Sequence, residues 1–290
     1  MTTIREVQRR VASHPTSDGA GVKLRRSLGA RPDLRLDPLL MLDEFYSDDP
    51  KDYLAGFPPH PHRGFETVTY MLDGHMRHED HLGNQGDLGP GGLQWMTAGR
   101  GIIHSEMPQQ SEGRMRGFQL WINLPSAEKM QPARYRDIQA DAIPELATAK
   151  GRVRVLAGSV TLDGQHAAGP VNGEPGAMST DPLYLDVRLG PDEVLEVPVK
   201  HSHNVFLYAF EHEVAIGTQG ERLAAHDGAM LGAGDRVRLQ GGGAGAAVLL
   251  IAAAPIGEPV AQYGPFVMNT RAELEQALAD YRDGRLAELA

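Results

Sequence analysis

Short apolar runs between glycines and prolines constrain the fold of this chain more than any other feature. Its 290 residues include 34 glycines and 20 prolines, which interrupt the sequence too often for long helices. Short strands at such spacing are typical of β-sandwiches and β-barrels. The clearest runs are 64–72, 93–97, 117–124, 183–189, 205–210 and 246–253, with a glycine-rich turn at 86–92. The pattern predicts an all-β protein.

One helix is expected, near the C-terminus. Thr270 and Glu273 stand three residues apart, the spacing of a capping box at a helix start. Gly284 marks its expected end. The residues between them that recur on one apolar face are Leu274, Ala277, Leu278 and Tyr281. We expect this helix to lie on the outside of the β structure.

Composition excludes several classes of protein. The formal net charge of -10 argues against a protein that grips nucleic-acid phosphates. The absence of cysteine excludes a disulfide framework and a thiolate site. Residues 2–11 are charged and lack the apolar core of a secretion signal, and no apolar run is long enough to span a membrane. We therefore expect a cytoplasmic protein.

Two pairs of side chains that can bind a metal are the main candidate site. His60 and His62 stand one residue apart, as do His104 and Glu106. In a strand, residues i and i+2 project from the same face, so each pair places both groups on one side of a sheet. Three imidazoles and one carboxylate can hold a divalent transition metal and leave about two of six positions open. The alternative is that these histidines are scattered over surface loops.

Neighbouring side chains are assigned other roles. Glu66 is expected to be structural or to orient an imidazole through its free N–H, with a ligand role as the alternative. Solvent exposure on a hairpin is expected for His75, His78 and His81. Side chains that belong either to a pocket or to the core are Phe57, Trp95, Met96, Gln119 and Trp121.

The two halves of the chain resemble each other weakly, which suggests a duplicated β unit. His60-Pro-His62 is matched by His201-Ser-His203, and the glycines at 89–91 are matched by those at 232–234. At a similar offset, His104 and Glu106 meet the apolar stretch 246–254. We therefore expect one metal site, in the N-terminal half. A metal held by the second histidine pair alone is the alternative.

Two segments resemble the signature motifs of the pirin family, within the cupin superfamily. They are Phe57–Tyr70, FPPHPHRGFETVTY, and Pro90–Pro108, PGGLQWMTAGRGIIHSEMP. Segments 37–45, 118–125 and 257–270 also match, whereas 140–255 matches more loosely. The resemblance implies a bicupin, two β-barrels packed face to face with a C-terminal helix. The expected domains are 1–135, which binds the metal, and 136–290, which carries the helix and no metal, with a linker near 125–145.

The resemblance also implies a metal and an activity. Pirins hold a mononuclear iron, and by motif the family's ligands fall on His60, His62, His104 and Glu106. We expect one divalent transition metal per chain, with Fe2+ favoured over Mn, Co, Ni, Cu or Zn. Several pirins resemble quercetin 2,3-dioxygenases, which open a flavonol ring with dioxygen. In that reaction Glu106 would act as the general base for the substrate hydroxyl.

The leading hypothesis is therefore a metal-dependent dioxygenase acting on a flavonol-like aromatic substrate. The alternative, which a resemblance to eukaryotic pirins implies, is a non-catalytic redox-sensing regulator whose iron sets a surface for a protein partner. A third hypothesis is another cupin reaction, such as an isomerase with the metal polarising a carbonyl. Neither nucleic acid nor membrane is expected as a direct partner.

Overall fold

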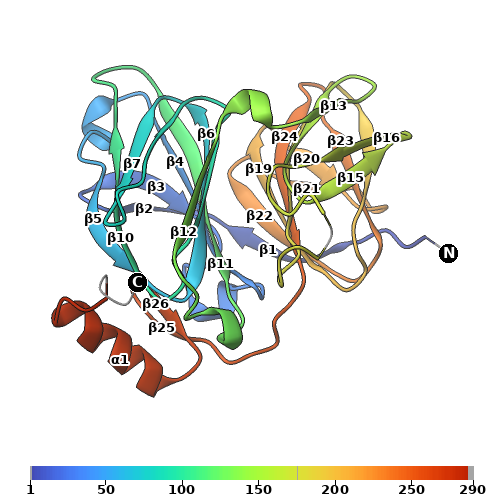
Figure 1. Cartoon of the computed structure of the whole chain (residues 1–290). Coiled ribbons are helices and arrows are strands. Elements are labelled where there is room, and N and C mark those ends of the chain that lie inside the picture. The colour runs from blue at the N-terminus through green and yellow to red at the C-terminus, as the bar shows by residue number, and fades with distance from the viewer. Residues whose placement is uncertain (1, 175, 287–290) are drawn as a thin grey trace. The chain divides into compact units, whose positions relative to one another are not determined.

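The computed structural model describes residues 2–174 and 176–286, and its regular secondary structure is almost entirely β-strand (Figure 1). Two compact units each combine separated segments of the chain. One unit, here called the histidine unit, comprises 15–26, 39–140 and the chain from 256 onward. The other, the C-half unit, comprises the chain up to 14 together with 27–38 and 141–255. The all-β prediction is confirmed.

The histidine unit contains a seven-stranded and a four-stranded sheet. The larger sheet has the order β12 (Arg134–Ile138), β9 (Leu93–Thr97), β6 (Phe65–Asp73), β11 (Met115–Asn123), β4 (Leu39–Ser47), β3 (Val22–Arg26) and β2 (His14–Asp18). The smaller sheet has the order β5 (Phe57–His62), β10 (Ile102–Pro108), β7 (Met76–Asp80) and β8 (Gln85–Leu88). The hairpin β25 (Ala261–Tyr263) and β26 (Phe266–Met268) and the helix α1 (Arg271–Arg282) complete it.

The C-half unit has the same two kinds of sheet. Its larger sheet has the order β1 (Val7–Ala12), β22 (Asp227–Leu231), β19 (Asn204–Glu211), β24 (Ala246–Ala253), β17 (Leu183–Leu189), β14 (Arg152–Ala157) and β13 (Glu145–Ala147). Its smaller sheet has the order β18 (Val194–Pro198), β23 (Arg236–Gly241), β20 (Val214–Ile216) and β21 (Glu221–Leu223). A hairpin joins β15 (Ser159–Leu162) and β16 (Gln165–Ala168). Single 3-10 turns occur in both units, at Pro32–Leu34, Pro50–Asp52, Ser126–Glu128 and Ala140–Ala142.

The strand order supports a duplication and corrects the alignment of the two halves. The chain forms the strands of both smaller sheets in the same order. The first strand formed is β5 in one sheet and β18 in the other, and the last is β10 and β23, so these strands correspond. The counterpart of the strand with His104 and Glu106 is therefore β23, RVRLQG, rather than the apolar β24. Neither β18 nor β23 contains a histidine, so these strands carry no counterpart of His60, His62 and His104.

The predicted elements agree closely with those observed. The strands predicted at 93–97, 183–189 and 246–253 have the predicted limits, and the other three differ at their ends by one or two residues. The stretch 86–92 is only partly a turn, because β8 extends through Leu88. The predicted helix is confirmed, and Thr270 and Glu273 form the expected capping box.

The two units do not divide the chain at a single point between 135 and 136, because each unit includes segments from both sides of that point. The N-terminal strand β1 pairs with β22 of the C-half unit. The helix α1 belongs to the histidine unit, where Ala277 packs with Phe266 and Leu286. Within the described residues, no helix is both long enough and apolar enough to cross a membrane.

Candidate metal centre

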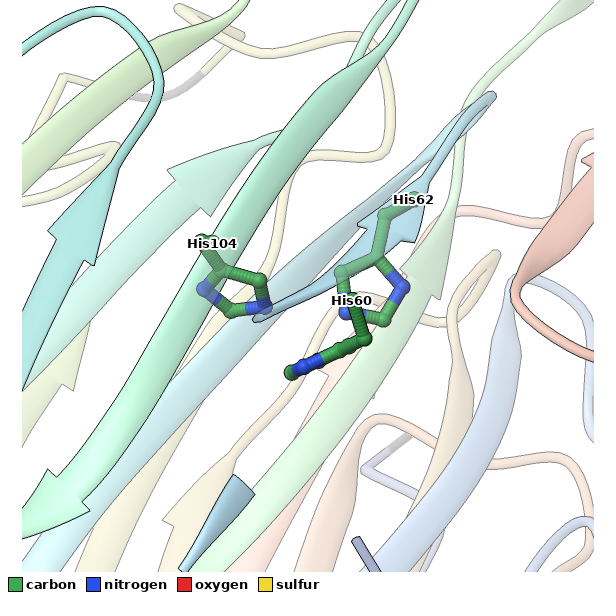
Figure 2. A group of neighbouring side chains, drawn as sticks. All are labelled: His60, His62 and His104. Carbon is green, nitrogen blue, oxygen red and sulfur yellow. The ribbon is translucent and has the colours of Figure 1, made fainter. Parts of the chain in front are cut away.

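Three histidines converge in the smaller sheet of the histidine unit. One ring nitrogen from each of His60, His62 and His104 lies within 4.8 Å of the others. Figure 2 shows the rings facing a common space, two from β5 and one from the neighbouring strand β10. The ring centroids are 4.4–4.9 Å apart. The pattern of alternate residues thus brings together the three imidazoles that the sequence singled out.

Strand pairing positions these rings. In the antiparallel ladder between β5 and β10, His104 is opposite His60, and Ile102 is opposite His62. The register then shifts between His104 and Glu106, which marks a bulge beside the ligand-bearing residues. The chain continues from His62 to Gly64, where φ is +89° and a Cβ would come within 2.0 Å of the Val267 carbonyl oxygen. Glycine is therefore required two residues after His62.

Burial keeps His62 and His104 neutral and available for a metal. Burial, together with the neighbouring imidazoles, holds the pKa of His62 and that of His104 well below the usual histidine range. The Nε2 atoms of both rings are buried and have no hydrogen-bond partner among the described residues. His60 is half-buried, and its Nδ1 donates to the carbonyl oxygen of Pro58 at 2.8 Å, which leaves Nε2 with its lone pair. Unpartnered, neutral imidazole nitrogens are the donors that a divalent transition metal requires.

Glu106 lies outside this group of three. Its carboxylate is buried and accepts hydrogen bonds from Thr69 Oγ1 and Gln119 Nε2, both at 2.8 Å. Trp121 Nε1 in turn donates to Gln119 Oε1 at 3.2 Å, and the Trp121 ring lies 5.4 Å from that of His62. Gln119 and Trp121 therefore lie beside the centre.

Strand alternation separates the remaining candidates. On β6, Thr69 reaches Glu106 and Phe65 contacts His62, so odd-numbered residues face the centre. Glu66 projects from the opposite face, where its Oε1 accepts from Thr97 Oγ1 at 2.6 Å. Burial raises the pKa of Glu66 to about 7. A ligand role for Glu66 is therefore excluded by its direction.

The pocket candidates divide by the same rule. Trp95 is opposite Val68 and so shares the face of Glu66, away from the triad. Met96 is opposite Thr67 and lies on the face of the triad, within a cluster with Ala98 and Ile102. Phe57 belongs to a separate apolar cluster that includes Phe45 and Met71.

His78 is a residue whose importance the sequence did not reveal. The prediction of solvent exposure holds for His81, and His75 is 43% exposed in its side chain, but it is wrong for His78, whose side chain is fully buried. Its Nδ1 lies 3.1 Å from Nδ1 of His104. The missed signal was strand alternation, because His78 follows the buried Met76 by two residues.

The second histidine pair is not a second triad. His203 is buried in a turn of the C-half unit, whereas His201 is exposed. His203 Nε2 lies 3.3 Å from Asp181 Oδ2, and burial lowers the pKa of His203 although Asp181 opposes this. His203 and Asp181 line a cavity of about 430 Å³, together with Lys200 and His166. Among the described residues, the only group of three or more potential ligands is that of His60, His62 and His104.

Comparison with protein families and known proteins assigns the chain. The family model described as Pirin matches residues 21–122, and the Pirin C-terminal cupin domain matches residues 184–287. A Pseudomonas aeruginosa protein, provisionally named a quercetin 2,3-dioxygenase, is 52% identical over 99% of this chain and 100% of its own length. Human pirin is 40% identical over 98% of this chain and 95% of its own length.

A solved structure shares the whole architecture. The crystal structure of quercetin 2,3-dioxygenase from Acinetobacter baumannii superposes with a TM-score of 0.87 at 30% identity, over 98% of this chain and 99% of that one. The two pairs of sheets thus form two cupin domains. From its motifs, its triad and these matches along its full length, the chain belongs to the pirin family.

Proposed function

We propose that this protein is a metal-dependent dioxygenase that opens a flavonol-type ring, with quercetin as a substrate. The observation that carries the proposal is the cluster of three imidazoles, in which His62 and His104 are buried, neutral and unpartnered at Nε2. The names of similar proteins support the same reaction, since the Pseudomonas aeruginosa relative is provisionally named a quercetin 2,3-dioxygenase and the Acinetobacter baumannii structure carries that name.

The proposed metal ligands are His60, His62, His104 and, on metal binding, Glu106. The three imidazoles fit a divalent transition metal by their donor type and separation. Iron bound there would supply Lewis acidity and a redox centre for dioxygen. Glu106 follows His104 by two residues on β10, so the carboxylate is on the strand that carries the third imidazole.

The residues around the triad have separate roles in this proposal. Phe65 and Trp121 offer apolar ring surface beside His62, which suits a flat aromatic substrate. Glu106 would accept the proton of the substrate hydroxyl on a carboxylate oxygen. Gln119 and Thr69, which donate to that carboxylate, would keep it oriented.

The test is oxygen consumption with quercetin in air, using protein with a measured complement of iron. Activity should follow iron content, disappear with a chelator and return when Fe(II) is added. Glu106→Gln should lower kcat more than it raises KM, because the lost proton acceptor is needed in the transition state.

One control variant and one contrary outcome complete the test. Glu79→Gln changes an exposed carboxylate on β7 and should leave both constants unchanged. No oxygen consumption by fully iron-loaded protein would contradict the dioxygenase proposal and favour the regulatory alternative.

A further inference from the structure

Two residues of β7 connect the metal centre to the hairpin between β7 and β8. The His78 side chain is fully buried, and its ring centroid lies 5.0 Å from that of His104. Their Nδ1 atoms are 3.1 Å apart, so one of them donates a hydrogen bond to the other. Asp80, two residues further on, is the other neighbour of His78, with Oδ2 3.4 Å from Nε2.

The Asp80 carboxylate is held in place by the hairpin. Its Oδ1 accepts from the backbone N–H groups of Leu82 and Asn84 at 2.9 and 3.0 Å. Its Oδ2 accepts from the side-chain Nδ2 of Asn84 at 2.9 Å. A carboxylate in such a network acts as an acceptor, so the hydrogen between Asp80 and His78 belongs to Nε2 of His78.

This assignment determines the proton on His104. A neutral imidazole carries one ring proton, so His78 Nδ1 is an acceptor once Nε2 is protonated. With His78 neutral, the hydrogen bond between the two rings is donated by Nδ1 of His104. Its Nε2 is left with a free lone pair, and this is the buried atom that has no hydrogen-bond partner.

Packing holds the His78 ring in this orientation. Tyr135 of β12 stacks on it with centroids 4.3 Å apart and planes 15° from parallel. Gly86 of β8 is opposite His78 in the ladder, and a Cβ at Gly86 would lie 1.8 Å from the Tyr135 hydroxyl oxygen. The glycine thus leaves the space in which Tyr135 can lie over His78.

We propose that Asp80 and His78 are positioning residues that impose the Nδ1–H tautomer on His104 and present its Nε2 to the metal. The inference rests on the proposed metal centre. It extends to His104 the arrangement seen at His60, whose Nδ1 donates to the Pro58 carbonyl oxygen. Such outer partners typically change metal affinity by about 10–100-fold when they are removed.

The tautomer can be measured without metal. In metal-free protein labelled with 15N-histidine, long-range 1H–15N spectra should show His104 protonated at Nδ1, with the signal assigned by its loss in His104→Ala. Asp80→Asn should increase the Nε2–H form, because an amide can turn its N–H toward His78 and reverse the chain of donors. His78→Gln should do the same, and it leaves the hairpin anchor at Asp80 intact if Asp80→Asn does not fold.

Metal affinity gives the second readout. In competition with a chromophoric chelator for Zn2+, Asp80→Asn and His78→Gln should bind about 10–100-fold more weakly than wild type. His78→Asn should retain most of the affinity, because its amide oxygen can occupy the position of Nδ1. His75→Gln, on the 43% exposed histidine at the start of the same hairpin, should match wild type.

The outcomes separate this inference from the proposed metal centre. A wild-type His104 protonated at Nε2, or equal Zn2+ affinity in every folded variant, would overturn the positioning role. A wild type with the Nδ1–H tautomer that binds no Zn2+ would support the role of Asp80 and His78 in setting the tautomer. The same result would overturn the metal centre itself.

Discussion

Burial gives individual side chains of the histidine unit unusual protonation behaviour. It keeps His62 and His104 neutral, and it raises the pKa of Asp43 to about 6 despite the hydrogen bonds from Arg26. Burial also lowers the pKa of Lys129 to about 8. These residues have different chemistry but share a cause, because a low-dielectric interior penalises whichever form is charged.

Glu66 should make the protein less stable as pH rises. Its pKa is about 7 in the fold against an ordinary 4.5, so between these values the native chain holds a proton that the unfolded chain has released. The free energy of unfolding contributed by this group therefore falls from pH 4.5 to 7 and is level above. Glu66→Gln cannot ionise and should be more stable than wild type at pH 8 by about 1–3 kcal/mol.

Urea unfolding of metal-free protein at pH 5 and pH 8 measures this effect. The gain from Glu66→Gln should be large at pH 8 and small at pH 5, whereas Glu79→Gln, at an exposed site, should show no such difference. Metal content should remain at the wild-type level, because Glu66 points away from the triad. A variant that loses its metal would contradict that geometry.

At the scale of elements, the C-terminal segment holds the end of β5 in place. Arg63, next to His62, donates from Nη1 to Asp280 of α1 at 2.8 Å, with both side chains buried. Lys129 Nζ donates to the carbonyl oxygens of Gly64 and Val267 at 2.7 and 3.1 Å. The strand with the first histidine pair is thus tied to β26 and α1 by buried charged groups.

Asp280→Ala should be strongly destabilising. It leaves the Arg63 guanidinium buried without its carboxylate, and breaking a buried ion pair on one side costs about 3–5 kcal/mol. Denaturant unfolding of metal-free protein should show the loss as a lower midpoint.

The matched control lies on the same helix. Glu275 pairs with Arg271 at 2.8 Å, four residues apart, and both side chains are largely exposed. Glu275→Ala should change the free energy of unfolding by less than about 0.5 kcal/mol. Equal effects of the two substitutions would show that the Arg63–Asp280 pair adds no stability.

At the scale of the whole molecule, two units with the same strand order differ in their side chains. The histidine unit carries His60, His62 and His104 on β5 and β10, whereas the corresponding β18 and β23 carry no histidine. A duplicated fold therefore does not imply a duplicated site, because metal binding depends on a few side chains and the sheets depend on many.

The purified protein should accordingly hold about one divalent metal per chain. Elemental analysis should show metal lost in His62→Ala and His104→Ala but retained in His203→Ala, which changes a buried histidine of the C-half unit. Circular dichroism should confirm that the variants remain folded. Two metals per chain in wild type would contradict the assignment of a single centre.

The sequence alone predicted six of the strands to within two residues at their ends, the helix, and the three imidazoles as candidate ligands. Strand limits at 93–97, 183–189 and 246–253 were predictable because each is a short buried run between turn residues, and alternate histidines share a face in any strand. These features were predictable because they depend on residues that are close together along the chain.

Only the tertiary structure determined which side chains surround the triad. The direction of Glu66 away from it, the contact of His78 with His104 and the pair of Arg63 with Asp280, 217 residues apart, all depend on which strands and segments meet. The same holds for the counterpart of β10, which a constant offset along the sequence placed at the wrong strand. Sheet order and register arise from the packing of whole sheets, so residues distant in sequence become neighbours for reasons that no local pattern contains.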